Sequence, residues 1–198
     1  CTLGESGETR SAAIEDITAV IVAARGVFFS MELIAALTEA NAIVLHCDES
    51  YKPTAVTSAV ERVISSAALV NQADQGSALH NRLWKRIVSA KVANQATVLE
   101  RAGKSAAYLR NEVENGPADE AACARHYWSE YFSIFGLEDV QRHGEDEKNI
   151  NAKLNYGYAV LGALVHRSII VHGLSPLFGM HHAIRYQAHA MVYDLMEP

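Results

Sequence analysis

Two acidic residues and a histidine near the end of the sequence carry side chains that could hold a divalent cation. Asp194 and Glu197 are three residues apart, so they would share one face of a helix. With the imidazole of His182 they offer the oxygen and nitrogen donors that suit Mg²⁺ or Mn²⁺. The same residues also fit a solvated helix edge and a polar loop. Their types and spacing raise a metal site as a hypothesis and do not require one.

A shared metal ion would require the chain to turn between these residues. If residues 182–197 formed one straight helix, His182 and Glu197 would be separated by roughly 22 Å. Ligands of one ion must converge far more closely than that. We therefore expect a turn between Arg185 and His189, although Ala183–Tyr193 contains no glycine or proline to mark it.

Other common catalytic motifs are absent from the sequence. It contains no phosphate-binding loop of the Walker type, no Gly-x-Gly-x-x-Gly and no Gly-x-Ser-x-Gly. Cys1, Cys47 and Cys123 lack any paired spacing, which argues against a disulfide framework or a zinc knuckle and suits a reducing compartment. No apolar run reaches the roughly 18–20 residues of a membrane span, and no signal-peptide pattern opens the chain. We expect a cytoplasmic protein that does not contact membranes.

The charge distribution gives a mixed indication about nucleic acids. The net charge of −6 counts against DNA as a partner, because phosphate contacts normally require a basic excess. Basic residues nevertheless concentrate in residues 82–110, whereas acidic residues gather in 112–120 and 138–147. A local basic face is therefore compatible with an acidic total.

The elements that must position these residues divide into two parts. Residues 17–22 and 42–45 are short, apolar and rich in β-branched residues, and they flank a helix predicted to begin at Met31 with Ser30 as its cap. From residue 56 the pattern becomes helical, near 56–71, 79–102, 104–114, 118–134 and 149–172. We predict an α+β protein in which a partial N-terminal β-rich domain (1–55) precedes an all-α-helical catalytic domain (56–198).

One predicted helix start bears on the chemistry. Asn115-Gly116-Pro117 ends one helix, and Asp119 is a candidate cap for the next, with Glu120 in its first turn. Cys123 is interpreted as a small core residue, and the aromatic residues of 127–132 as a core stripe.

Five stretches, in order along the chain, resemble motifs of the CRISPR spacer-acquisition integrases. LWKRIV at 83–88 with Lys91, Asn94, Gln95 and Leu99 is similar to a helix of the type II branch of that family. Further likenesses are EAACARHYW at 120–128, NAKLNYGY at 151–158, HGLSPLFGMHH at 172–182, and Arg185-Tyr186 followed by DLMEP at 194–198. The chain starts with Cys1 and stops within a helical pattern, so we expect a fragment that lacks both ends.

The resemblance implies a site and a reaction. By likeness, Glu120, His182 and Glu197 are catalytic metal ligands for Mg²⁺ or Mn²⁺, with Asp194 as a further acidic ligand. Water activated there would nick DNA, and a DNA 3′-hydroxyl would attack a phosphodiester and insert a captured segment into a CRISPR repeat. The family further implies a homodimer that binds a small ferredoxin-like partner nuclease.

Four basic residues are candidate contacts to DNA phosphates, which fix position rather than sequence: Lys85, Arg86, Lys91 and Arg185. Their alternative interpretation is solvated helix charge.

Two other functions stay open at this point. A catalytically inactive helical subunit for DNA binding or assembly would keep the fold, although the intact Glu120, His182 and Glu197 argue against it. An unrelated metal phosphohydrolase is the other, although such sites generally show His-Asp or Asp-Asp pairs.

Overall fold

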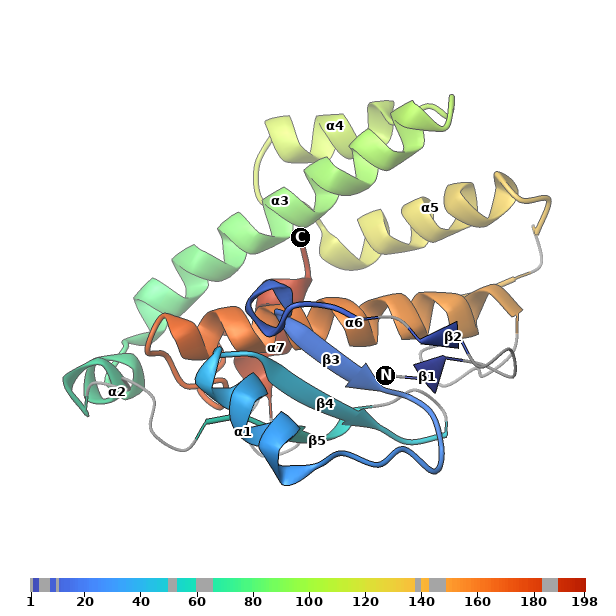
Figure 1. Ribbon diagram of the computed structural model, residues 1–198. Coiled ribbons are helices and arrows are strands. Elements are labelled where there is room, and N and C mark those ends of the chain that lie inside the picture. Colours follow the sequence, from blue (N-terminus) through green and yellow to red (C-terminus); the bar gives the residue numbers. More distant parts are fainter. Residues whose placement is uncertain are drawn as a thin grey trace.

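The protein, seen here as a computed structural model, combines α-helices with a small β-sheet (Figure 1). The structure describes residues 2–3, 8–9, 11–49, 53–59, 66–137, 140–142, 149–182 and 189–198. Among them, no helix is both long enough and apolar enough to cross a membrane.

The N-terminal part is built on a three-stranded sheet with the order β3-β4-β5. β3 (Ala19–Val22) and β4 (Ile43–Cys47) are parallel, and β5 (Pro53–Thr57) runs antiparallel to β4. α1 (Met31–Glu39) connects the two parallel strands. The 3-10 turn η1 (Ile14–Asp16) precedes β3. The short strands β1 (Thr2–Leu3) and β2 (Glu8–Thr9) pair separately. The predicted order of strand, helix and strand is confirmed.

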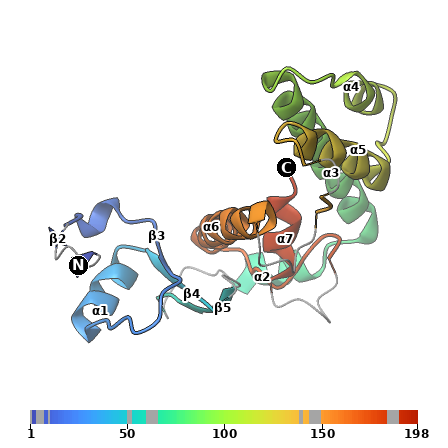
Figure 2. The same cartoon turned by 90° about the vertical axis from the view of Figure 1, so that its right-hand side faces the viewer.

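Each face of β4 packs against a different helix. Side chains alternate along a strand, so Val44 meets Leu37 of α1 while Ile43 and Leu45 meet Ala163 of α6. Figure 2 shows the sheet between α1 and α6. The Ser30 Oγ caps α1 by accepting from the Leu33 backbone N–H at 3.2 Å, as the sequence predicts.

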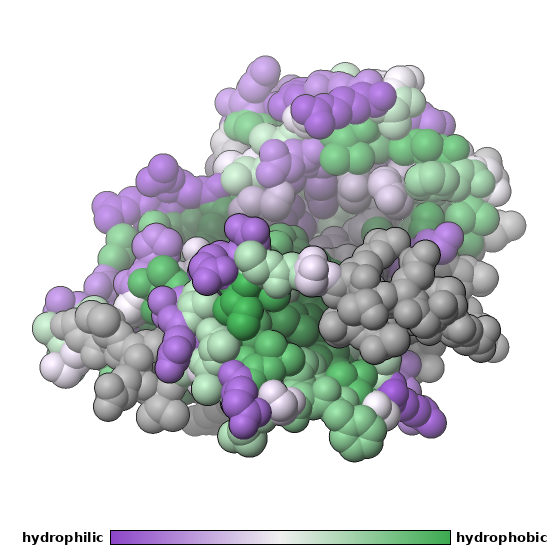
Figure 3. Space-filling model, in the orientation of Figure 1, coloured by the Kyte–Doolittle hydropathy of each residue, from purple (hydrophilic) through white to green (hydrophobic). Residues whose placement is uncertain are grey.

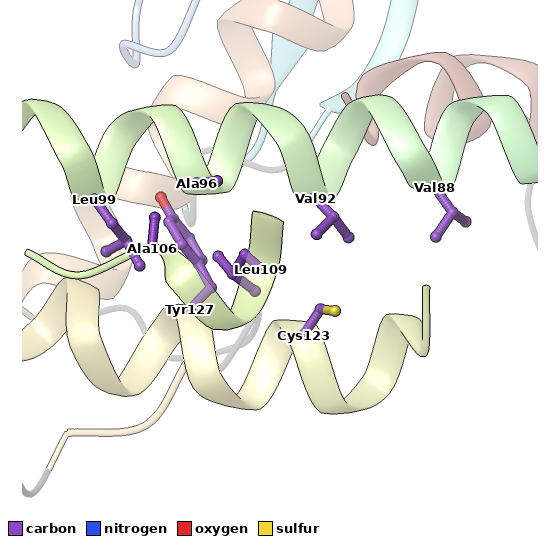
Figure 4. Close-up of a cluster of buried hydrophobic side chains, with 8 residues drawn as sticks. All are labelled: Val88, Val92, Ala96, Leu99, Ala106, Leu109, Cys123 and Tyr127. Atoms are coloured by element: carbon purple, nitrogen blue, oxygen red, sulfur yellow. The ribbon is translucent and has the colours of Figure 1, made fainter. Parts of the chain in front are cut away.

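The remaining elements are helices: α2 (Ser66–Ala73), α3 (Ser77–Arg101), α4 (Ala107–Glu114), α5 (Glu120–Ser133), α6 (Asn149–Val171) and α7 (Ala190–Met196). α3, α4 and α5 enclose one core, drawn in Figure 4. Val88, Val92, Ala96 and Leu99 of α3 recur at helical spacing and face Cys123 and Tyr127 of α5. Cys123 is completely buried, which confirms it as a core residue.

The prediction of a helix from residue 56 is wrong at its start. Residues 53–57 form β5, whose Thr57 Oγ1 is hydrogen-bonded to the His46 Nε2 at 2.9 Å. The sequence interpretation treated Pro53 only as a chain breaker, but proline is tolerated in a strand at the sheet edge. The predicted boundary after residue 55 falls inside this strand, and the two-domain division stays a prediction.

Surface polarity differs between the two parts of the molecule. Figure 3 shows hydrophilic surface gathered over the α4 end and apolar surface over the sheet. Large exposed apolar side chains in the N-terminal part include Phe28, with 94% of its surface exposed, and Met31.

Candidate functional site

Two acidic side chains from distant segments meet at the ammonium group of Lys91. Glu120 is the first residue of α5, and Glu197 follows directly after α7. The Lys91 Nζ lies 2.9 Å from the Glu120 Oε1 and 2.5 Å from the Glu197 Oε2. The middle of α3, the start of α5 and the end of α7 therefore converge at one point.

Local structure explains how these two carboxylates are placed. Asp119 caps α5, since its Oδ1 accepts from the Ala122 backbone N–H at 3.0 Å, and this fixes Glu120 in the first turn as predicted. At the other end, the Asn94 Nδ2 donates to the Pro198 carbonyl at 2.7 Å. Asn94 lies about one helical turn beyond Lys91 on α3 and holds the chain beside Glu197.

The site is strongly charged and partly enclosed. Only 16% of the Lys91 side chain is exposed, against 35% for Glu120 and 24% for Glu197. Burial alone lowers the pKa of Lys91, but its hydrogen bonds to Glu197 and Glu120 outweigh that effect and leave the pKa above its ordinary value. The lysine is therefore charged at neutral pH, and its charge faces both carboxylates.

His182 is held by Asp194, which has no exposed surface. The Asp194 Oδ1 lies 2.6 Å from the His182 Nδ1 and also accepts from the His182 backbone N–H at 3.1 Å. Its Oδ2 accepts from the backbone N–H groups of Met180 and of His181. Since Asp194 follows His182 by twelve residues, the chain does double back between them. The position predicted for the turn lies outside the described residues, except for His189 at its end.

Two helices hold the loop that carries His181 and His182. Trp84 of α3 stacks on the His181 ring, with 4.0 Å between centroids and 5° between planes. Gln72 of α2 binds the backbone of Ser175 on both sides: its Oε1 accepts from the N–H and its Nε2 donates to the carbonyl, each at 2.8 Å. The side-chain amide of Gln72 thus makes the pair of backbone hydrogen bonds that an adjacent β-strand would otherwise make with Ser175.

A cavity of about 690 Å³ opens beside these groups. Lys91, His182 and Glu197 line it together with aromatic and polar side chains of α5 and α6, such as Tyr158 and Asn155. Two of the predicted ligands, His182 and Glu197, therefore border a space that could admit a ligand.

The structure brings the predicted ligands together in two pairs. Glu120 and Glu197 share the ammonium of Lys91, and His182 is paired with Asp194. Among the described residues, no three side chains of His, Cys, Asp or Glu form a cluster that could hold a metal ion as they stand. Their assignment as metal ligands and catalytic residues stays a prediction.

The donor chemistry nevertheless fits a divalent cation. Two carboxylate oxygens already converge on a positive charge, and oxygen donors are what Mg²⁺ and Mn²⁺ prefer. Asp194 occupies the Nδ1 of His182, which leaves Nε2 as the nitrogen for a metal, an arrangement common for metal-binding histidines. All four Asp194 contacts point to a supporting role for this carboxylate.

The candidate phosphate contacts differ from one another. Lys85 and Arg86 are exposed on α3, whereas the Lys91 ammonium is directed at the two carboxylates. Arg185 lies outside the described residues.

Sequence reasoning missed Gln72, Trp84 and Asn94 as supports of the site. Trp84 and Asn94 belong to the α3 motif that carried the resemblance, which was the signal available for them. No pattern in the sequence marks Gln72, because its partner Ser175 lies 103 residues further along the chain.

Comparison with known proteins gives consistent matches. The sequence matches the family model for CRISPR associated protein Cas1 over residues 2–198. The CRISPR-associated endonuclease Cas1 of Neisseria meningitidis serogroup C (strain 8013) is 31% identical over 202 residues, which cover 98% of this chain and 64% of that relative. The chain thus spans just under two thirds of the relative's length.

Two solved structures share the fold. A Cas1 protein from Thermotoga maritima superposes with a TM-score of 0.79 at 18% identity, over 98% of this chain and 66% of that one. A casposase bound to its integration product superposes with a TM-score of 0.77 at 21% identity, over 92% of this chain and 57% of that one.

Proposed function

The chain belongs to the Cas1 family of CRISPR-associated proteins, and on that premise we propose that it is part of a metal-dependent DNA endonuclease and integrase of CRISPR adaptation. The proposed reaction inserts captured DNA segments into a CRISPR array by attack of a 3′-hydroxyl on a phosphodiester. The Neisseria relative is named an endonuclease, and the casposase is described with its integration product, so both support cutting and joining of DNA.

One observation carries the proposal: Glu120 at the start of α5 and Glu197 at the end of α7 converge on a single positive charge, and the anchored His182 lines the same cavity as Lys91 and Glu197. Glu120, Glu197 and the His182 Nε2 would hold Mg²⁺ or Mn²⁺, with Asp194 as a support or a further acidic ligand. When bound there, such an ion would supply Lewis-acid activation of a water or 3′-hydroxyl and would neutralise charge on the reacting phosphate.

Other side chains of this protein position the proposed metal ligands. Asp194 fixes the orientation of the His182 ring, and the cap Asp119 aims Glu120 from the first turn of α5. Lys85 and Arg86, exposed on α3, and Arg185 would bind DNA phosphates near this site.

The wider architecture and partners form part of the same proposal. We assign an α+β organisation, with a partial β-rich domain (1–55) and an α-helical catalytic domain (56–198). The whole protein would act in the cytoplasm as a homodimer that binds a small ferredoxin-like nuclease, a captured DNA segment and the CRISPR repeat.

Strand transfer tests the proposal directly. The full-length protein is incubated with a short duplex that has free 3′-hydroxyl ends and with repeat-containing DNA, in Mn²⁺ or in EDTA. We expect joined product only with Mn²⁺, and none from the Glu120→Ala, His182→Ala and Glu197→Ala variants. Glu114→Ala, an exposed acid at the end of α4, is the matched control and should retain activity.

The same assay separates the other candidate functions. DNA binding without turnover would indicate an inactive assembly subunit, and hydrolysis of small phosphoesters alone would indicate a phosphohydrolase. Full activity in any one of the three alanine variants would refute the assignment of that residue.

A further inference from the structure

Lys91 stands where the two carboxylates of the proposed site meet, and the site therefore already contains a positive charge. Its Nζ hydrogen-bonds the Glu120 Oε1 at 2.9 Å and the Glu197 Oε2 at 2.5 Å. A divalent ion held by the same two oxygens would need the place where the ammonium now lies. The ammonium and the ion would then compete for one position.

The surroundings show that this contact is built into the fold. Lys91 follows the α3 core residue Val88 by three positions and precedes Val92 by one, and both valines are buried against α5. The lysine stem is thereby fixed beside Glu120. Asn94, on the same helix, holds the Pro198 carbonyl and keeps Glu197 within reach.

Charge explains what the lysine does in this place. Glu120 and Glu197 are like charges that point at the same spot, and they would repel each other if nothing positive stood between them. An exposed surface lysine would have its charge in water, but the Lys91 side chain is largely covered and faces acids from two different segments.

We propose that Lys91 is a positioning residue that occupies the meeting point of Glu120 and Glu197 in the metal-free protein and leaves it when a divalent cation binds. This inference rests on the proposed function, because it takes these two carboxylates as metal ligands. Lys91 holds the two like-charged acids together while the metal is absent, and the need to displace it weakens metal binding. The released ammonium then lies beside the cavity, where it can bind a substrate phosphate.

Metal affinity tests the displacement without any measurement of catalysis. Binding of Mn²⁺ is measured for wild type, Lys91→Met and Lys91→Arg by titration calorimetry and by the electron paramagnetic resonance signal of free Mn²⁺. Methionine keeps much of the stem and removes the charge that the ion must displace, so we expect the Kd to fall about tenfold, a change of about 1.4 kcal/mol. Arginine retains the charge and should stay close to wild type.

Two further variants distinguish a failure of the inference about Lys91 from a failure of the proposed function. Glu120→Gln and Glu197→Gln should each weaken Mn²⁺ binding strongly. If they do, and Lys91→Met binds Mn²⁺ no more tightly than wild type, the inference about Lys91 is wrong and the proposed ligands stand. If both glutamine variants bind Mn²⁺ like wild type, the ligand assignment fails and the inference fails with it.

The wild-type protein gives an independent measurement that needs no variant to fold. Lysine amines are acetylated briefly with an N-hydroxysuccinimide ester in EDTA or in Mg²⁺, and each site is quantified by mass spectrometry. We expect Lys91 to react several-fold more in Mg²⁺, because the ammonium loses its two carboxylate partners. Lys85, exposed on the same helix, is the internal control and should not change. Equal acetylation of Lys91 in both conditions would overturn the proposal.

Discussion

The His182 Nδ1 lies 2.6 Å from the Oδ1 of the fully buried Asp194. A carboxylate can only accept hydrogen bonds, so this contact places the proton of the imidazole on Nδ1 and directs the lone pair of Nε2 away from Asp194. The same carboxylate binds three successive backbone N–H groups, those of residues 180–182. One side chain of α7 thus sets both the path of the loop and the tautomer of the histidine.

Asp194→Asn is expected to destabilise the protein and to disorder this loop. The amide NH₂ of asparagine would face backbone N–H groups that also donate, so at least one buried donor loses its acceptor, at a cost of about 1–3 kcal/mol. Urea denaturation measures the change in the free energy of unfolding. Glu114→Gln, which makes the same chemical change at an exposed position, should leave stability within about 0.5 kcal/mol. Equal stability of the two variants would show that Asp194 does not hold the loop.

Gly179→Ala tests how tightly the loop packs on α7. A methyl group at this position would lie 2.7 Å from the Ala190 Cβ and 2.9 Å from the Asp194 Oδ2, so the loop or the helix must shift. We expect a loss of about 1–3 kcal/mol, typical of overpacking. Thermal unfolding gives the measurement.

Gly157→Ala is the matched control for that substitution. Gly157 lies inside α6 and has nothing within 4 Å of an added Cβ, so alanine there should stabilise the protein by about 0.5–1 kcal/mol. If both alanine variants shift the melting temperature in the same direction, the close packing at Gly179 is not what limits stability.

Gln72→Ala is expected to loosen the segment before His181. The variant removes both hydrogen bonds to the backbone of Ser175, a buried residue, so we expect a loss of about 1–3 kcal/mol. Hydrogen exchange of the Ser175 amide should accelerate, because its N–H loses its acceptor. Gln75→Ala removes only an exposed contact within the same region, to the Asn71 carbonyl, and should leave that amide unchanged. Unchanged exchange in Gln72→Ala would contradict the assigned role.

Much of the fold follows from local signals in the sequence. Ser30 and Asp119 mark two helix starts, and both side chains cap as predicted because capping involves residues only three apart. β5 was not predicted as a strand, because its five residues contain few apolar side chains and begin with a proline. Its identity as a strand comes from pairing with β4, which is a tertiary contact that no local pattern encodes.

The residues of the candidate site could be predicted from the motifs, but the contacts between them could not. Glu120 entered only through the resemblance, since a single acid in a first helical turn is also an ordinary helix start. The contact between Lys91 and Glu197 joins α3 to the end of the chain, and neither periodicity nor spacing relates residues so far apart. The sequence interpretation gave Lys91 as a candidate contact to DNA phosphates, which stays a prediction, and it did not foresee that the ammonium lies against the two acids.

His189 should make the stability of the protein depend on pH. Burial lowers the pKa of His189 below its ordinary value of 6.5, its ring packs at 5.0 Å from that of His166, and its Nδ1 has no hydrogen-bond partner among the described residues. The folded protein therefore binds this proton less readily than the unfolded chain. Its contribution to stability is fully present above pH 6.5 and is lost as the pH falls from 6.5 through the folded pKa.

His189→Gln removes that titration and keeps a polar side chain of similar length. We expect the variant to lose less stability than wild type between pH 7.5 and pH 5, measured as the urea midpoint at each pH. All other ionisable side chains are the same in the two proteins, so the difference between their pH profiles isolates His189. Parallel profiles for the two proteins would show that the imidazole of His189 keeps its ordinary pKa in the fold.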